Sequence, residues 1–84
     1  YPNPFNPSTT IAFSLPLEEK VRLNIYDISG RLISTLVEEK MGRGYHSVVW
    51  DGIDMQGNVV SAGMYIYSLE TESITLVNKM IFMK

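Results

Sequence analysis

Apolar side chains recur at every second position through most of this chain. The clearest example is residues 20–27, where Val21, Leu23 and Ile25 alternate with more polar residues. Residues 10–15, 45–50 and 63–70 show the same alternation, and helical spacing is nearly absent. Successive side chains of a strand point to opposite faces, so this spacing is typical of strands that bury one face. The sequence therefore predicts an all-β fold.

Turn-forming residues separate these segments and set the number of strands. Gly30, for example, can supply the positive φ that a tight hairpin requires. The predicted strands cover residues 10–15, 20–27, 32–37, 45–50, 59–60, 63–70 and 73–83. About seven short antiparallel strands favour a β-sandwich, although a small barrel would show the same alternation. Residues 32–40 also fit a helical turn or two, but they follow a hairpin turn and we assign them to a strand.

The opening residues are of a different kind. Pro2, Pro4 and Pro7 fix φ and lack backbone N–H donors, so this segment cannot be a central strand. We expect an extended, stiff lead-in over residues 1–8, anchored by Phe5 on one end of the sandwich. Residues 9–84 then form one small domain, since 84 residues leave no room for a second.

Composition excludes several classes of function. Apolar residues make up 45% of the chain, which favours a folded unit over a disordered one. The seven basic residues are scattered and the net charge is −2, so nucleic acid is not an expected partner. The apolar stretches are far shorter than the roughly 20 residues that span a bilayer. Without cysteine, disulfides and thiol chemistry are excluded, whereas the compartment stays open.

His46 is the single histidine and the first place to look for catalysis. It shares a strand face with Val48 and Trp50, which favours a partly buried structural residue. The pairs Glu18-Glu19 and Glu38-Glu39 stand beside turns, and neighbours on an extended chain point to opposite faces. Neither pair can converge on a substrate as glycosidase acids do, and solvated turns explain both better. The chain is predicted not to be an enzyme.

The loop from Asp51 to Asn58 is the one place where a bound cation is conceivable. Oxygen atoms of Asp51, Asp54 and Asn58 would suit calcium. The EF-hand spacing fails, however, because its bidentate glutamate would fall at Ala62. Asx turns, in which Asp side chains accept backbone amides, account for the same residues. No cofactor is therefore predicted, with calcium in this loop as the alternative.

Five segments in the same order resemble one known family. They are residues 1–11 (YPNPFNPSTTI), 25–31 (IYDISGR), 49–52 (VWDG), 62–65 (AGMY) and 79–84 (KMIFMK). Together they resemble the type A C-terminal sorting domain of the type IX secretion system, over essentially the whole chain. The immunoglobulin-like (Ig-like) domain of the flagellar hook-capping protein is similar through the middle section.

The resemblance implies an Ig-like sandwich at the C-terminus of a surface or secreted bacterial protein. Such proteins reach the periplasm by an N-terminal signal, and the outer-membrane translocon then recognises the folded domain. A sortase usually removes the domain while it attaches the upstream passenger to the cell surface. The last strand carries much of the signal in that family. The matching positions here are Lys79, Met80, Ile81, Phe82, Met83 and Lys84.

The remaining motif residues are expected to be structural. Trp50 is the largest core candidate, Asp51 and Gly52 turn the chain after it, and Asp27 and Gly30 shape a hairpin. The other residues assigned to this structural set are Pro4, Phe5, Gly63 and Tyr65.

Other interpretations of the chain stay open. A terminal edge strand can pair with a partner's strand, but Met80 and Phe82 would also serve simply as core residues beside solubilising lysines. The domain would then be a retained structural or adhesive module. A carbohydrate-binding module requires two exposed, coplanar tyrosines. Assembly into a fibre by strand exchange is a further alternative to the expected monomer.

Overall fold

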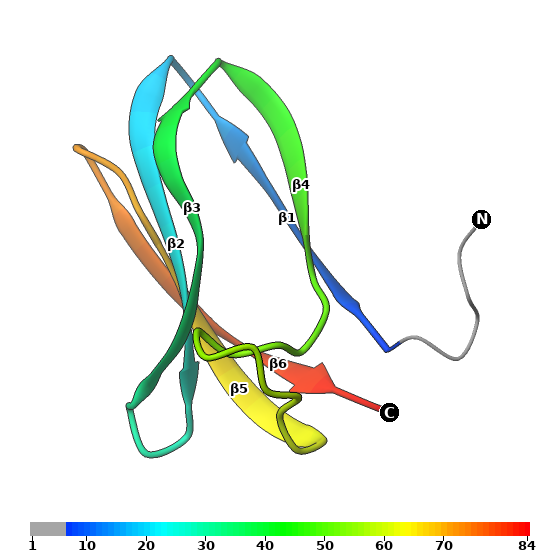
Figure 1. Cartoon of the computed structure of the whole chain (residues 1–84). Coiled ribbons are helices and arrows are strands. Elements are labelled where there is room, and N and C mark those ends of the chain that lie inside the picture. The colour runs from blue at the N-terminus through cyan, green and yellow to red at the C-terminus, as the bar shows by residue number, and fades with distance from the viewer. Residues whose placement is uncertain (1–6) are drawn as a thin grey trace.

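The alternating segments form six β-strands in the computed structural model, which describes residues 7–84 (Figure 1). The strands are β1 (Thr9–Leu15), β2 (Glu19–Asp27), β3 (Leu32–Met41), β4 (Gly44–Trp50), β5 (Gly63–Glu70) and β6 (Thr75–Phe82). The strand assignment of residues 32–40 is confirmed. The expected strand at Val59-Val60 was wrong, because this segment makes only an isolated bridge between Ile53 and Val59. The count is therefore six strands instead of seven.

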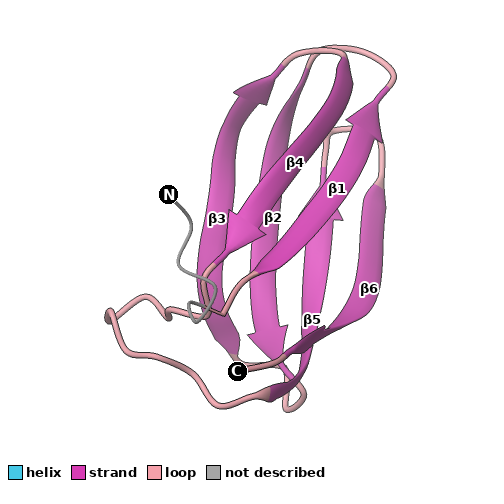
Figure 2. Cartoon of the chain, turned by 90° about the vertical axis from the view of Figure 1, so that its right-hand side faces the viewer, coloured by secondary structure: helices cyan, strands magenta, loops and turns pink. Residues whose placement is uncertain are grey.

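The strands form two antiparallel sheets that face each other, which confirms the predicted all-β sandwich. One sheet has the order β3-β2-β5-β6, and the other consists of β1 and β4. Figure 2 shows β1 and β4 lying over the larger sheet. Strand β1 begins at Thr9, where the predicted lead-in ends. Pro4 and Phe5, with the predicted anchoring of the lead-in, lie outside the described residues.

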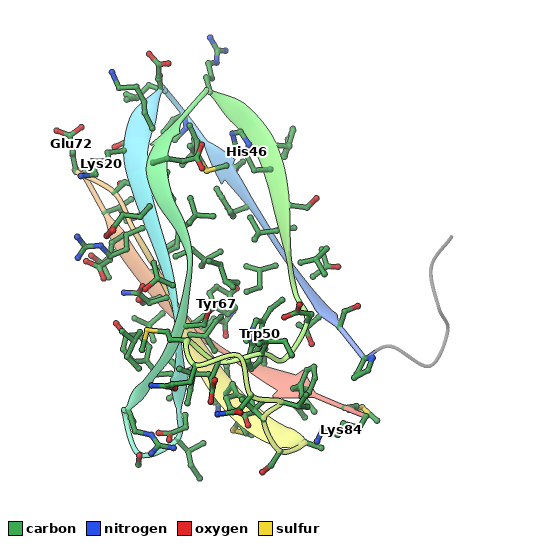
Figure 3. All side chains as sticks on the ribbon, viewed as in Figure 1. Lys20, His46, Trp50, Tyr67, Glu72 and Lys84 are labelled. Carbon is green, nitrogen blue, oxygen red and sulfur yellow. The ribbon has the colours of Figure 1, made fainter. Side chains whose placement is uncertain are left out.

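The core lies between the two sheets and is centred on aromatic rings from three strands. Trp50 at the end of β4 is 1% exposed, and its ring centroid lies 5.0 Å from that of Tyr65 and 5.1 Å from that of Phe82. The indole Nε1 donates a hydrogen bond to the carbonyl of Ile53 at 3.2 Å, so its single polar group is satisfied. The other buried apolar residues are Ile11, Leu15, Val21, Leu23, Ile25, Ile33, Val37 and Leu69. Figure 3 shows Trp50 inside this core.

Two surface turns share one hydrogen-bond pattern. In the β2–β3 turn, Asp27 Oδ1 accepts the backbone N–H groups of Ser29 and Arg31 at 2.9 and 3.0 Å. In the loop after Trp50, Asp54 Oδ1 accepts those of Gln56 and Asn58, both at 2.9 Å. Each turn also has a positive-φ glycine three residues after the aspartate, Gly30 or Gly57. The predicted structural role of Asp27 and Gly30 is thus a specific five-residue turn, and the same turn occurs twice.

These contacts change the ionisation of Asp27. The Ser29 hydroxyl donates to Asp27 Oδ1 at 2.6 Å, and this bond, followed by the Arg31 amide, holds the pKa of Asp27 below its ordinary value of 3.8. Because the pKa is lower in the folded state, the carboxylate's contribution to stability is complete at neutral pH. It is lost as the pH falls through the folded-state pKa.

Replacement of Trp50 is expected to destabilise the fold. Trp50→Ala removes the ring that contacts Tyr65 and Phe82 and should lower the free energy of unfolding by about 3–5 kcal/mol. Chemical denaturation measures this change. Tyr45→Ala on the same strand is the control, because Tyr45 is 93% exposed and its loss should change stability by less than about 0.5 kcal/mol. Equal effects of the two substitutions would contradict the placement of Trp50 at the centre of the core.

The Asp27 turn predicts a pH dependence of stability. The melting temperature of the wild type should fall as the pH drops below about 4, and Asp27→Asn should make that fall shallower. Thermal melts at a series of pH values measure it. Glu39→Gln, which removes an exposed carboxylate outside the turn, should leave the slope as it is in the wild type. An unchanged slope in Asp27→Asn would show that this carboxylate does not couple protonation to folding.

Candidate functional site

The last strand, β6, is an edge of the four-stranded sheet and the candidate site of recognition. It pairs with β5 from Gly63↔Phe82 to Glu70↔Thr75, and the sheet order ends there. Figure 1 shows β6 leading directly to the C-terminus. An edge strand has one row of backbone groups without a strand partner, which is the geometry that strand addition uses.

The alternation of β6 divides the predicted recognition residues into two sets. Phe82 is fully buried and Met80 is partly buried against the core. Lys79 and Ile81 point the other way and are exposed, and the exposed Met83 follows the end of the strand with Lys84. The residues 79–84 therefore do not form one continuous surface. Met80 and Phe82 belong to the fold, whereas the other four are open to a partner.

The Phe82 ring packs β6 against the rest of the domain at Gly52. Gly52 is buried, has a φ of +75°, and a Cβ at this position would overlap the Phe82 ring. Any side chain here would thus meet both an unfavourable backbone conformation and an occupied space. The backbone at Gly52 has the positive φ of a turn, and the missing side chain makes room for the ring that anchors the last strand.

Polar contacts hold both ends of β6. Near its end, the Thr9 hydroxyl donates to the carbonyl of Ile81 at 3.4 Å. Just before its start, the Ser73 hydroxyl donates to Glu19 Oε1 at 2.9 Å. Glu19 is only 3% exposed, so the expectation of two solvated carboxylate pairs was wrong for this residue. Its neighbour Glu18 is exposed, as the alternation of an extended chain requires.

The other candidate residues occupy structural positions. His46 Nε2 lies 2.6 Å from the Gly42 carbonyl and its ring lies 5.5 Å from that of Phe13. The hollow beside His46 is lined by Ala12, Phe13, Ser14, Tyr45 and Ser47, and no carboxylate lines it. This arrangement supplies a hydrogen bond at the β3–β4 turn and no acid to orient the imidazole as a base.

The exposure of the tyrosines tests the alternative of a carbohydrate-binding module. Tyr45 is highly exposed, whereas Tyr65 is 7% exposed and its hydroxyl donates to the Ser61 carbonyl at 2.7 Å. Burial, and secondly the charge of Asp27, raise the pKa of Tyr65 above its ordinary value of 10.0. Tyr26 and Tyr67 are partly buried. Within residues 7–84, then, Tyr45 lacks the second fully exposed tyrosine that a flat stacking platform needs.

The loop from Asp51 to Asn58 uses its oxygen atoms for its own backbone. Asp51 Oδ1 accepts the N–H of Ile53 at 3.2 Å, and Asp54 Oδ1 accepts the two amides of its turn. Within residues 7–84, no three His, Asp or Glu side chains lie close enough together to hold a metal ion. Nor does this part of the chain contain a helix long and apolar enough to cross a membrane.

The Gly52–Phe82 contact gives a direct test of how the last strand is held. Gly52→Ala should lower the free energy of unfolding by at least about 2 kcal/mol. The new Cβ overlaps the Phe82 ring, and this overpacking adds to the strain of a positive φ at a residue other than glycine. Gly57→Ala is the matched control: its φ is +86° but the space for a Cβ is empty, so only strain of about 1–2 kcal/mol is expected. Chemical denaturation measures both. The Gly52→Ala cost should also shrink in a Phe82→Leu background, and an unchanged cost there would disprove the steric contact.

Comparisons with known proteins agree with this architecture. The sequence profile of the FlgD Ig-like domain matches residues 5–74. The crystal structure of FlgD from P. aeruginosa superposes with a TM-score of 0.72 and 24% sequence identity. That alignment covers 90% of this chain and 59% of the FlgD chain, so this chain spans less than two thirds of its structural relative. A search of curated proteins found no significant match.

The structural likeness shows that the sandwich is Ig-like, as predicted. The profile match covers most of the chain but ends just before β6, so Lys79–Lys84 lie beyond it. On the profile match and the shared architecture, the chain belongs to the FlgD Ig-like domain family.

Proposed function

We propose that this chain is a non-catalytic C-terminal sorting module whose last strand is recognised by the type IX outer-membrane translocon. The observation that carries the proposal is the position of β6. It is a sheet edge, it presents Lys79 and Ile81 outward, and the exposed Met83 and Lys84 follow it. The sequence resemblance described above includes these terminal residues. A partner can therefore contact β6 without unfolding the domain.

In this proposal the domain over residues 9–84 follows a passenger protein, joined to it through the lead-in of residues 1–8. The passenger and the module reach the periplasm together and are then exported to the cell surface or the medium. The partners are the translocon and the sortase components, and the module itself acts as a monomer without a cofactor. Its buried residues maintain the fold, and the exposed residues of its last strand form the sorting signal.

A second candidate function is a retained Ig-like structural module. Membership of the FlgD Ig-like domain family favours it, because that membership is carried by residues 5–74 and does not depend on β6. Such a module would remain on the mature protein as a spacer or an adhesive unit. The two functions differ in whether residues 79–84 are needed for export.

Transplantation tests the proposal. The 84 residues are fused behind a signal-peptide-bearing fluorescent protein in a bacterium with a type IX system. Fluorescence should reach the surface or the medium, and should stay in the periplasm in a translocon-deficient strain. A fusion that lacks Lys79–Lys84 should also stay in the periplasm, although this deletion removes Phe82 and its folding must be checked by limited proteolysis. Periplasmic retention of the folded full-length fusion in the competent strain would favour the structural module instead.

A further inference from the structure

One end of the outer face of the larger sheet combines apolar side chains with a single lysine. The outer face is the side that points away from β1 and β4. On β5 and β6 the paired residues of this face are Met64↔Ile81, Ile66↔Lys79 and Ser68↔Val77. We name the five residues Met64, Ile66, Val77, Lys79 and Ile81 the Lys79 patch. Cross-strand pairing and the two-residue repeat of β6 make these side chains neighbours.

The apolar residues of the Lys79 patch are open to solvent. Val77 is 65% exposed, Ile81 59% and Met64 46%, while Ile66 is partly buried beneath them. Isolated exposed apolar residues are common on protein surfaces, but adjacent ones on two paired strands form a continuous patch. Three of the five residues lie on β6, the strand that the proposed function already assigns to recognition.

Charges are distributed unevenly over this outer face. At the far end of β2, Arg22 pairs with Glu38 at 3.0 Å, and Arg22 and Lys20 line a hollow with Glu70 and Glu72. Figure 3 shows Lys20 and Glu72 close together at that end. Basic and acidic side chains are thus mixed there. Lys79 takes part in neither of the ion pairs found within residues 7–84, and its neighbours on the patch are all apolar.

We infer that the Lys79 patch is the surface that the translocon reads, and that it binds a protein surface in which a carboxylate is surrounded by apolar side chains. This inference rests on the proposed function. Burial of Lys79 without an anionic partner would be costly, so the bound partner has to supply a negative charge opposite it. A second copy of this chain that docks through the same patch does not meet the requirement, because the patch has a cation and no anion.

A different role for Lys79 would be simple protection of the sheet edge. A charged residue on an edge strand discourages pairing with other chains, and that role does not depend on the sign of the charge. Lys79→Glu therefore separates the two roles. The substitution keeps a charged, solvated edge but turns attraction to a carboxylate into repulsion.

The experiment measures export of the fluorescent fusion with single substitutions in the full 84-residue chain. Lys79→Glu should lower surface fluorescence by about tenfold or more, and Ile81→Ser should lower it too, with melting temperatures close to the wild type. Lys79→Arg, which keeps the positive charge, should be exported as well as the wild type. The matched controls are Lys40→Glu, at the opposite edge of the same face, and Val49→Ser on β4, which is 59% exposed like Ile81. Both controls should export normally.

Four outcomes would overturn the inference. If the wild-type fusion is exported, removal of Lys79–Lys84 blocks export, and Lys79→Glu and Ile81→Ser export normally, the proposed function stands but the patch is not its surface. If the wild-type fusion itself is not exported, the proposed function and the patch fail together. A wild-type dimer in size-exclusion chromatography that Lys79→Glu converts to a monomer would assign the patch to a second copy. Should Lys79→Glu fail to fold, export of the neutral Lys79→Gln variant decides instead, and normal export overturns the inference.

Discussion

The contact between the Phe82 ring and the backbone of Gly52 links the two sheets of this fold. Phe82 comes from the last strand of the larger sheet, and Gly52 follows Trp50, the last residue of the smaller sheet. The ring also lies 5.1 Å from that of Trp50 and 6.5 Å from that of Tyr65. A thin core of this kind has few other contacts to replace it, because a small domain buries a limited share of its surface. Loss of this contact would release the last strand and expose the aromatic core together.

This anchoring explains how one strand would serve both the fold and the proposed recognition. The two-residue repeat of β6 places Met80 and Phe82 against the core and Lys79 and Ile81 on the outer face. A partner that reads the outer set therefore reads a strand whose position is fixed by the inner set. The proposed sorting module would present its address only when the domain has folded, since an unfolded chain does not separate these two sets of side chains.

Much of the fold follows from local patterns in the sequence. Alternation and turn residues together located the six strands to within a few residues, and the size of Trp50 at the end of an alternating segment pointed to the core. Val59-Val60 misled the prediction, since two apolar residues between turns make a bridge without a strand partner long enough to extend it. The repeated Asp-x-x-Gly spacing at Asp27 and Asp54 was a visible signal that sequence reasoning missed.

Long-range features had no such signal. Nothing near Gly52 in the sequence indicates that Phe82, 30 positions later, occupies the space of its missing side chain. The buried Glu19 likewise accepts a hydrogen bond from Ser73, 54 positions later in the chain. The Lys79 patch exists because β5 pairs with β6 in one register, and a shift by one residue would turn Lys79 toward the core.

Native-state amide hydrogen exchange tests most directly whether β6 is an integral part of the fold. The account predicts that protected amides of β6 near Phe82 exchange only by global unfolding, with the same free energy of opening as amides in the central strand β2. Exchange of the β6 amides at a much lower free energy, while β2 stays protected, would contradict it. The last strand would then open independently, and the Phe82–Gly52 contact would not fix the surface that we assign to recognition.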